Sequence, residues 1–203
     1  MTMTRLLFSL LVLIPITCNA QTDFQKFNIT PEGTILCNNK EYCVYPFPGE
    51  SKEILLQKFV KACNLYKNDL YHSKFVHSPK NEEIKIKSLI HSCQYDFYGT
   101  DIGADELYVS IRLSDYAGFA TYRLVCSYHF CFKDNKVKVD VACDKYVKTG
   151  DDDDLEIKDF YKDGQPKSNK RGSALEVFNK MINTNVEDIL TISREVSINN
   201  YDW

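Results

Sequence analysis

The segment from Cys126 to Cys143, CSYHFCFKDNKVKVDVAC, places three cysteines and a histidine around the pair Asp134-Asn135. Thiol and imidazole groups at this density suit three kinds of chemistry: a metal site, a reactive thiol with its base, or a disulfide. Residue types alone do not choose among these three. The choice depends on which side chains share a face of the secondary structure.

Residues on both sides of Asp134-Asn135 alternate between apolar and polar, which predicts two antiparallel strands joined by a two-residue turn. Asp and Asn both tolerate the positive φ that such turns require. The turn then sets a register in which three apolar pairs share one face: Phe132 with Val137, Phe130 with Val139, and Tyr128 with Val141. The same register opposes Cys126 and Cys143 at a non-hydrogen-bonded position, where Cα atoms lie about 4.5 Å apart. That separation suits a disulfide, so we predict a Cys126–Cys143 bond.

A zinc site is disfavoured because Cys126 and Cys131 face opposite sides of one strand. His129 and Cys131 share the polar face, and the register places His129 opposite Asp140. These three residues are the catalytic candidates, because nucleophilic catalysis uses such groups. However, residues two apart on a strand are about 6.8 Å apart at Cα, too far for a hydrogen bond between short side chains. A His129–Asp140 surface pair is therefore the favoured interpretation, and we predict no catalytic residue, no metal and no cofactor.

The first twenty residues have the pattern of a secretory signal peptide, with Arg5 before an apolar run from Leu6 to Ile16 and small or polar residues up to Ala20. The run is too short to cross a bilayer, which takes about 20 residues. We therefore predict a secreted, extracellular protein that begins at Gln21 and has no membrane span. The formal net charge of −3 provides no general attraction to nucleic acid.

Cysteines of a secreted protein are expected to form disulfides. Those beyond the signal peptide are Cys37, Cys43, Cys63, Cys93, Cys126, Cys131 and Cys143. Besides Cys126–Cys143, proximity predicts Cys37–Cys43 and inward orientation predicts Cys63–Cys93, which leaves Cys131 unmatched. The sequon Asn28-Ile-Thr predicts a glycosylated Asn28.

The order of elements predicts one α+β domain preceded by an extension. The expected segments are an N-terminal extension over 21–50 with a short hairpin or disulfide-closed loop, a helix and antiparallel sheet over 51–149, an acidic and polar loop over 150–172, and a C-terminal amphipathic helix over 173–203. The first helix should begin at Ser51 and end near Leu70. A phase change in the first strand predicts a bulge near Ser88. The last helix should begin at a capping box of Ser173 and Glu176, and it is either continuous or broken near Asn183.

A helix followed by a four-stranded antiparallel meander is similar in order to the cystatin-like and nuclear-transport-factor-2-like cones. The resemblance is one of architecture and implies a curved sheet wrapped around the helix. The Gln-x-Val-x-Gly and Pro-Trp hairpins of cystatin inhibitors are absent, and the single tryptophan is Trp203. Protease inhibition therefore has no support from residues.

We predict a secreted, disulfide-stabilised, non-enzymatic binding module for a small apolar ligand or an extracellular protein. Two alternatives remain: an enzyme that uses His129, Asp140 and Cys131, or an effector or inhibitor that acts through hairpin loops such as 99–105. A homodimer formed through the odd cysteine or the C-terminal helix is also open. Arg112 and Arg123 could receive an anion, although pairing with Glu106 or solvation is the simpler expectation.

Overall fold

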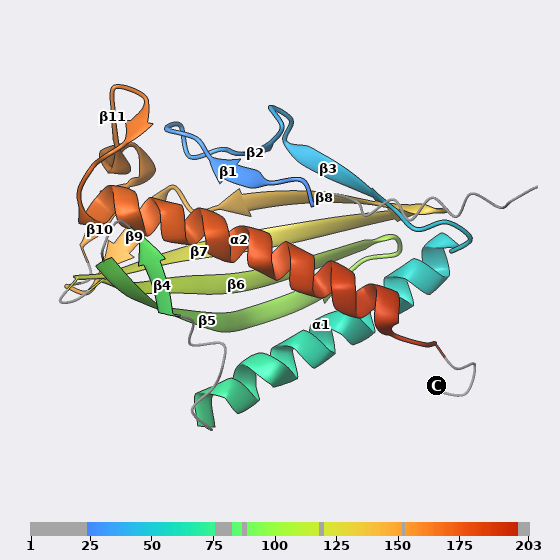
Figure 1. Cartoon of the computed structure of the whole chain (residues 1–203). Coiled ribbons are helices and arrows are strands. Elements are labelled where there is room, and N and C mark those ends of the chain that lie inside the picture. Colours follow the sequence, from blue (N-terminus) through green and yellow to red (C-terminus); the bar gives the residue numbers. More distant parts are fainter. Residues whose placement is uncertain (1–23, 76–82, 87–88, 118–119, 152, 199–203) are drawn as a thin grey trace, which may run out of the picture.

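The structure is a computed structural model that describes residues 24–75, 83–86, 89–117, 120–151 and 153–198. Within these ranges the chain is a mixed α+β structure with a large antiparallel sheet and two α-helices (Figure 1). The elements are β1 (Phe27–Ile29), β2 (Ile35–Cys37), β3 (Tyr42–Pro46), α1 (Lys52–Phe75), β4 (Glu83–Ile86), β5 (Leu89–Ile102), β6 (Glu106–Ala117), β7 (Ala120–Lys133), β8 (Lys136–Cys143), β9 (Tyr146–Thr149), β10 (Asp154–Glu156), the 3-10 helix η1 (Ile157–Phe160), β11 (Tyr161–Lys162), β12 (Gln165–Pro166) and α2 (Lys170–Glu195). Neither helix, over the residues described, has an apolar stretch long enough to cross a bilayer.

The large sheet has eight strands, and its long central strands β5, β6, β7 and β8 are antiparallel neighbours. Strand β4 extends the sheet beyond β5, and β3 extends it beyond β8. Strand β9 pairs with the beginning of β7, and β10 pairs with β9. The expected cystatin-like or nuclear-transport-factor-2-like cone with a four-stranded meander is therefore not confirmed, because the sheet is larger and carries two helices.

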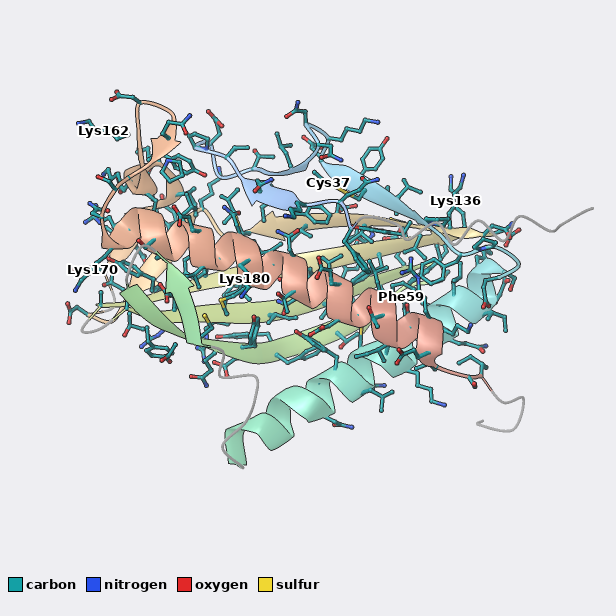
Figure 2. All side chains as sticks on the ribbon, viewed as in Figure 1. Cys37, Phe59, Lys136, Lys162, Lys170 and Lys180 are labelled. Carbon is teal, nitrogen blue, oxygen red and sulfur yellow. A yellow bond between two sulfur atoms is a disulfide. The ribbon has the colours of Figure 1, made fainter. Side chains whose placement is uncertain are left out.

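Both helices cover the same face of this sheet, which we call the inner face, and the opposite, helix-free face is the outer face (Figure 1). Apolar residues alternate along β6 and β7 so that one side of each strand is buried against the helices. Phe59 of α1 shows the packing (Figure 2). Its ring centroid lies 5.3 Å from that of Phe130 and 5.1 Å from that of Phe132. The inner face is thus occupied by helix side chains.

Helix α1 begins where the sequence predicts. Ser51 accepts a hydrogen bond from the Ile54 amide, and Leu55, Phe59 and Tyr66 are buried along one side. The helix continues to Phe75, beyond the predicted end near Leu70. Strands β4 and β5 are antiparallel partners, so the predicted first strand is divided into two in this region. The bulge predicted near Ser88 lies outside the described residues.

The register predicted for β7 and β8 is confirmed. Phe132 pairs with Val137, Tyr128 with Val141, and Cys126 with Cys143. Asn135 adopts a positive φ of 64° in the turn, as a tight connection requires. The amide of Asp144 donates to the Val125 carbonyl, 3.0 Å away, which places Cys126 and Cys143 at the expected non-hydrogen-bonded position.

One of the three predicted disulfides, Cys37–Cys43, is present, and it closes the loop between β2 and β3. The Cys126–Cys143 bond is absent, because the Cys143 thiol turns away and donates to the Gly33 carbonyl. The Cys63–Cys93 bond is also absent. Cys63 faces inward, as predicted, and burial raises the pKa of its thiol to about 12.

The segment 150–172 is not the polar loop that its composition predicts. It contains β10, η1, β11 and β12, since Ile157 and Phe160 are buried and anchor the chain to the core. Helix α2 begins at Lys170, with Asn169 as its N-cap, three residues before the predicted capping box at Ser173. The helix is continuous at Asn183.

Helix α2 also holds the N-terminal strand in place. The side chain of Asn183 accepts a hydrogen bond from the Phe27 amide at 2.8 Å and donates to the Phe27 carbonyl at 2.9 Å. Asn179 accepts a further bond from the Ile29 amide. The apolar face of α2 is buried within the chain, so the structure does not support dimerisation through that face.

Candidate functional site

The three catalytic candidates meet on the outer face, where β7 supplies His129 and Cys131 and β8 supplies Asp140. The Nδ1 atom of His129 lies 3.1 Å from Oδ2 of Asp140, its partner across the strands. The Nε2 atom lies 3.2 Å from Sγ of Cys131. The prediction that His129 and Cys131 are too far apart to bond is wrong, because the imidazole leans along the strand and spans the Cα separation. Cys126 faces inward and is not part of this group, as the alternation of side chains along the strand predicts.

Strand β6 adds two residues that the sequence analysis did not place here. Glu106 and Tyr108 pair in register with Cys131 and His129. The Oε2 atom of Glu106 lies 3.1 Å from His129 Nε2, and it accepts a hydrogen bond of 2.8 Å from the Tyr108 hydroxyl. The Tyr108 ring stacks on the imidazole, with centroids 4.1 Å apart and planes 4° apart. Both ring nitrogens of His129 therefore face a carboxylate oxygen, and the ring is fixed in orientation.

Lys138 completes this group, which we call the His129 cluster: Glu106, Tyr108, His129, Cys131, Lys138 and Asp140. Its ammonium lies 3.2 Å from Oδ1 of Asp140, the oxygen that does not face His129. Beside the cluster is a hollow of about 480 Å³, whose lining includes Glu41 and Tyr42, at the start of β3. A ligand in this hollow would contact His129, Lys138 and Asp140 directly.

The cluster contains the parts of a cysteine nucleophile, but its electrostatics oppose that role. Burial raises the pKa of the Cys131 thiol, and the carboxylates of Asp140 and Glu106 add to the effect, while Lys138 acts in the opposite direction. A nucleophilic cysteine needs the reverse, a pKa lowered toward neutrality so that the thiolate is present. At neutral pH Cys131 therefore remains a thiol.

This electrostatic setting predicts slow alkylation of Cys131. At pH 7 we expect iodoacetamide to modify it more slowly than a free cysteine, whose pKa is near 8.5. Because the pKa is raised, the rate should increase at a higher pH than that of a free cysteine. Peptide mass spectrometry of the native protein locates the label, and Cys131→Ser identifies its background. Labelling at pH 7 as fast as free cysteine would contradict this account and support the enzyme alternative.

A second hollow of about 490 Å³ lies on the outer face, nearer the opposite end of β7. Its charged lining consists of Arg112, Arg123, Lys145, Lys148, Asp144 and Asp154, with Tyr98 and Tyr146 beside them. Arg112 does not pair with Glu106, the partner the sequence suggested. Its Nε lies 3.0 Å from Asp96 Oδ2, and this bond raises the pKa of the guanidinium.

The sequence signal for Glu106 and Tyr108 lay in the register between β6 and β7. Alternation identifies the outward residues of each strand, but the sequence analysis derived a register only for the strands on either side of Asp134-Asn135 and none for β6 with β7. The candidate set therefore stopped at one hairpin. Lys138 is two residues from Asp140 on β8 and faces the same side of the sheet, so the alternation of β8 alone could have added it to the candidate residues.

No protein-family model and no curated protein matches the sequence. A TBP-like protein from Parabacteroides distasonis ATCC 8503 is similar in structure, with a TM-score of 0.50 and 8% identity over 77% of this chain and 92% of that chain. A DUF4468 family protein from Bacteroides ovatus ATCC 8483 has a TM-score of 0.40 and 9% identity, over 75% of this chain and 84% of that one. At 8% identity, the first comparison supports the fold alone, a large antiparallel sheet with helices. Function must therefore be argued from the outer face.

Proposed function

We propose that the protein is a secreted, non-enzymatic binding module that recognises an acidic extracellular protein through its outer face. The observation that carries this proposal is the concentration of exposed tyrosines there. Five tyrosines on this face are 36% to 61% exposed: Tyr42, Tyr98, Tyr108, Tyr116 and Tyr146. Tyrosine is enriched at protein interfaces because it offers a large, amphipathic contact area at a small entropic cost.

Several of these tyrosines are held in place before any partner binds. Tyr108 bonds to Glu106, and the hydroxyl of Tyr116 donates to Gln94 at 3.0 Å. Tyr98 accepts a hydrogen bond from Arg112. Side chains that are already ordered lose little conformational freedom on association, which favours affinity.

The charge around the second hollow supports an acidic partner. Four basic side chains line it, those of Arg112, Arg123, Lys145 and Lys148, against the acidic Asp144 and Asp154. Two of the four are balanced within the chain, because Arg112 bonds to Asp96 and Lys148 lies 3.3 Å from Asp154, so the remaining positive excess is small. Complementary charge at an interface favours one partner over others and speeds association. An acidic segment of the partner would therefore lie across this hollow, between Tyr98 and Tyr146.

The inner face gives less support to the small apolar ligand that the sequence also allowed. Helices α1 and α2 fill it with buried side chains. A hydrogen-bonded chain from Tyr66 through Asn185 to Tyr128 crosses from helix to helix to sheet within that core. A ligand there would have to displace packed aromatic rings.

Secretion remains part of the proposal, supported by the signal-like sequence before Gln21 and by the Cys37–Cys43 disulfide. Residues 1–23 lie outside the described structure. Asn28 is exposed in β1, which suits a glycan.

The experiment is affinity capture from the extracellular fluid of the source organism with three immobilised forms of the protein. The wild type and Leu65→Ala, which changes an exposed residue of α1 on the helical side, should capture the same partner. Tyr98→Ala/Tyr146→Ala should lose it, and salt should elute it, because the contact combines aromatic area with charge. Equal capture by the double variant, or a partner that salt does not weaken, would overturn the proposal.

A further inference from the structure

Three different metal-ligating groups converge in the His129 cluster, and their spacing suits one ion. We propose that His129 Nδ1, Cys131 Sγ and Asp140 Oδ2 bind a divalent transition metal ion of the zinc class. Ligating atoms of these three residues all lie within 4.8 Å of one another. The inference does not depend on the partner proposed above, although Tyr108 belongs both to this cluster and to the exposed tyrosines of the outer face.

Two of the three distances between the ligands are close to the edges of a coordination tetrahedron. Nδ1 lies 3.1 Å from Asp140 Oδ2 and 3.8 Å from Cys131 Sγ. Zinc bonds of about 2.0–2.3 Å place neighbouring ligands about 3.3–3.6 Å apart. The two observed values lie within a few tenths of an ångström of that interval. The sulfur lies nearer Nε2, at 3.2 Å, so binding through Nδ1 requires Cys131 Sγ to move toward that nitrogen.

The scaffold that places these ligands is a sheet. His129 and Cys131 are two residues apart on one face of β7, and Asp140 is the cross-strand partner of His129 on β8. The tight turn at Asp134-Asn135 fixes that register. A site built on paired strands keeps its geometry better than a site on loops, which lowers the cost of organising it around an ion.

Glu106 and Tyr108 supply the outer hydrogen bonds that metal-binding histidines have in proteins. Such a histidine donates its second ring nitrogen to a carboxylate or a carbonyl, which orients the ring and makes it a better ligand. Glu106 Oε2 lies 3.1 Å from Nε2, and Tyr108 both bonds to Glu106 and stacks on the imidazole. Asp140 is oriented likewise, because Lys138 bonds its other oxygen, Oδ1.

The ligand set selects the class of ion. One nitrogen, one sulfur and one oxygen suit zinc or cobalt, whereas calcium and magnesium prefer oxygen ligands throughout. On binding, the Cys131 thiol releases its proton to solvent, and the thiolate and the Asp140 carboxylate balance the two positive charges. Three protein ligands leave a coordination position for water or for a ligand in the neighbouring hollow of about 480 Å³.

Titration of the full-length mature protein with Co²⁺ tests the proposal, because zinc itself gives no absorption from d electrons. The protein is first reduced mildly and freed of metal. We expect a sulfur-to-cobalt charge-transfer band that saturates at one ion per chain and disappears when Zn²⁺ is added. Cys131→Ser should abolish the band, while Cys143→Ser, which removes another half-buried thiol outside the cluster, should keep it.

Competition with a chromophoric chelator gives the Zn²⁺ affinity of each variant. His129→Gln and Asp140→Asn each remove a ligand and should weaken Zn²⁺ binding. Glu106→Gln removes the carboxylate that orients His129, and it should weaken Zn²⁺ binding by about 10–100-fold. Circular dichroism confirms that each variant is folded. Absence of the band in the wild type, its retention in Cys131→Ser, or its loss in Cys143→Ser would each overturn the proposal.

Discussion

Gly172→Ala should lower the free energy of unfolding by about 3 kcal/mol, because it places a methyl group inside occupied space. Gly172 lies in the first turn of α2, and an ideal Cβ there would lie 1.7 Å from the Lys167 carbonyl oxygen and 2.6 Å from the Lys167 carbonyl carbon. These are backbone atoms, so relief requires movement of the chain and not the rotation of a side chain.

That chain segment is itself held in place, which is why the cost should be large. The Lys167 amide donates to the Phe160 carbonyl at 2.9 Å, and its ammonium donates to the Asp159 carbonyl at 2.7 Å. Phe160 is fully buried. Displacing Lys167 therefore strains η1 and the start of α2 together.

Urea denaturation followed by circular dichroism measures the effect, and Gly99→Ala is the matched control. A Cβ at Gly99 would meet no atom within 4 Å, so that variant should stay within about 0.5 kcal/mol of wild type. Equal midpoints for the two alanine variants would show that α2 does not begin against Lys167 as described.

Asn185→Leu should cost about 2–4 kcal/mol of stability, although leucine has a similar size and is apolar. Asn185 is fully buried, accepts a hydrogen bond from the Tyr66 hydroxyl of α1, and donates to the Tyr128 hydroxyl of β7 at 2.7 Å. The substitution removes both bonds. A buried hydroxyl that loses its partner costs about 1–3 kcal/mol, because water cannot replace that partner.

A double-mutant cycle separates this polar contribution from packing. Tyr128→Phe removes the hydroxyl that Asn185→Leu strands, so the double variant should be more stable than the two single losses predict by about 1 kcal/mol or more. The urea midpoints of the four proteins give the coupling. Strictly additive losses would mean that Asn185 and Tyr128 do not interact.

The features that the sequence predicted correctly depend on local patterns. Alternation around Asp134-Asn135 predicted the register that opposes Cys126 and Cys143, and short separation predicted the Cys37–Cys43 bond. Spacing by three and four residues predicted the buried side of α1, including Phe59.

The features that it missed depend on contacts between distant segments. Strand β3 pairs with β8, and Ile157 and Phe160 are buried, through contacts that no local pattern encodes. The same limit applies within the site. The alternation of side chains along β7 predicted that His129 and Cys131 share a face. Only the rotamer of the imidazole brings Nε2 to 3.2 Å from the Cys131 sulfur. Cys143 has the right register for a disulfide and still directs its thiol at Gly33.

The central claim is the register of β7 against β8, because it brings Asp140 to the outer face beside His129. Nuclear Overhauser contacts between Hα protons measure it directly, since these protons approach closely only in non-hydrogen-bonded antiparallel pairs, where Cα atoms are about 4.5 Å apart. The account predicts strong Hα–Hα contacts for Cys126 with Cys143 and for Tyr128 with Val141. Contacts displaced by one residue, such as Tyr128 with Ala142, would turn Asp140 away from His129 and contradict both the cluster and the metal site built on it.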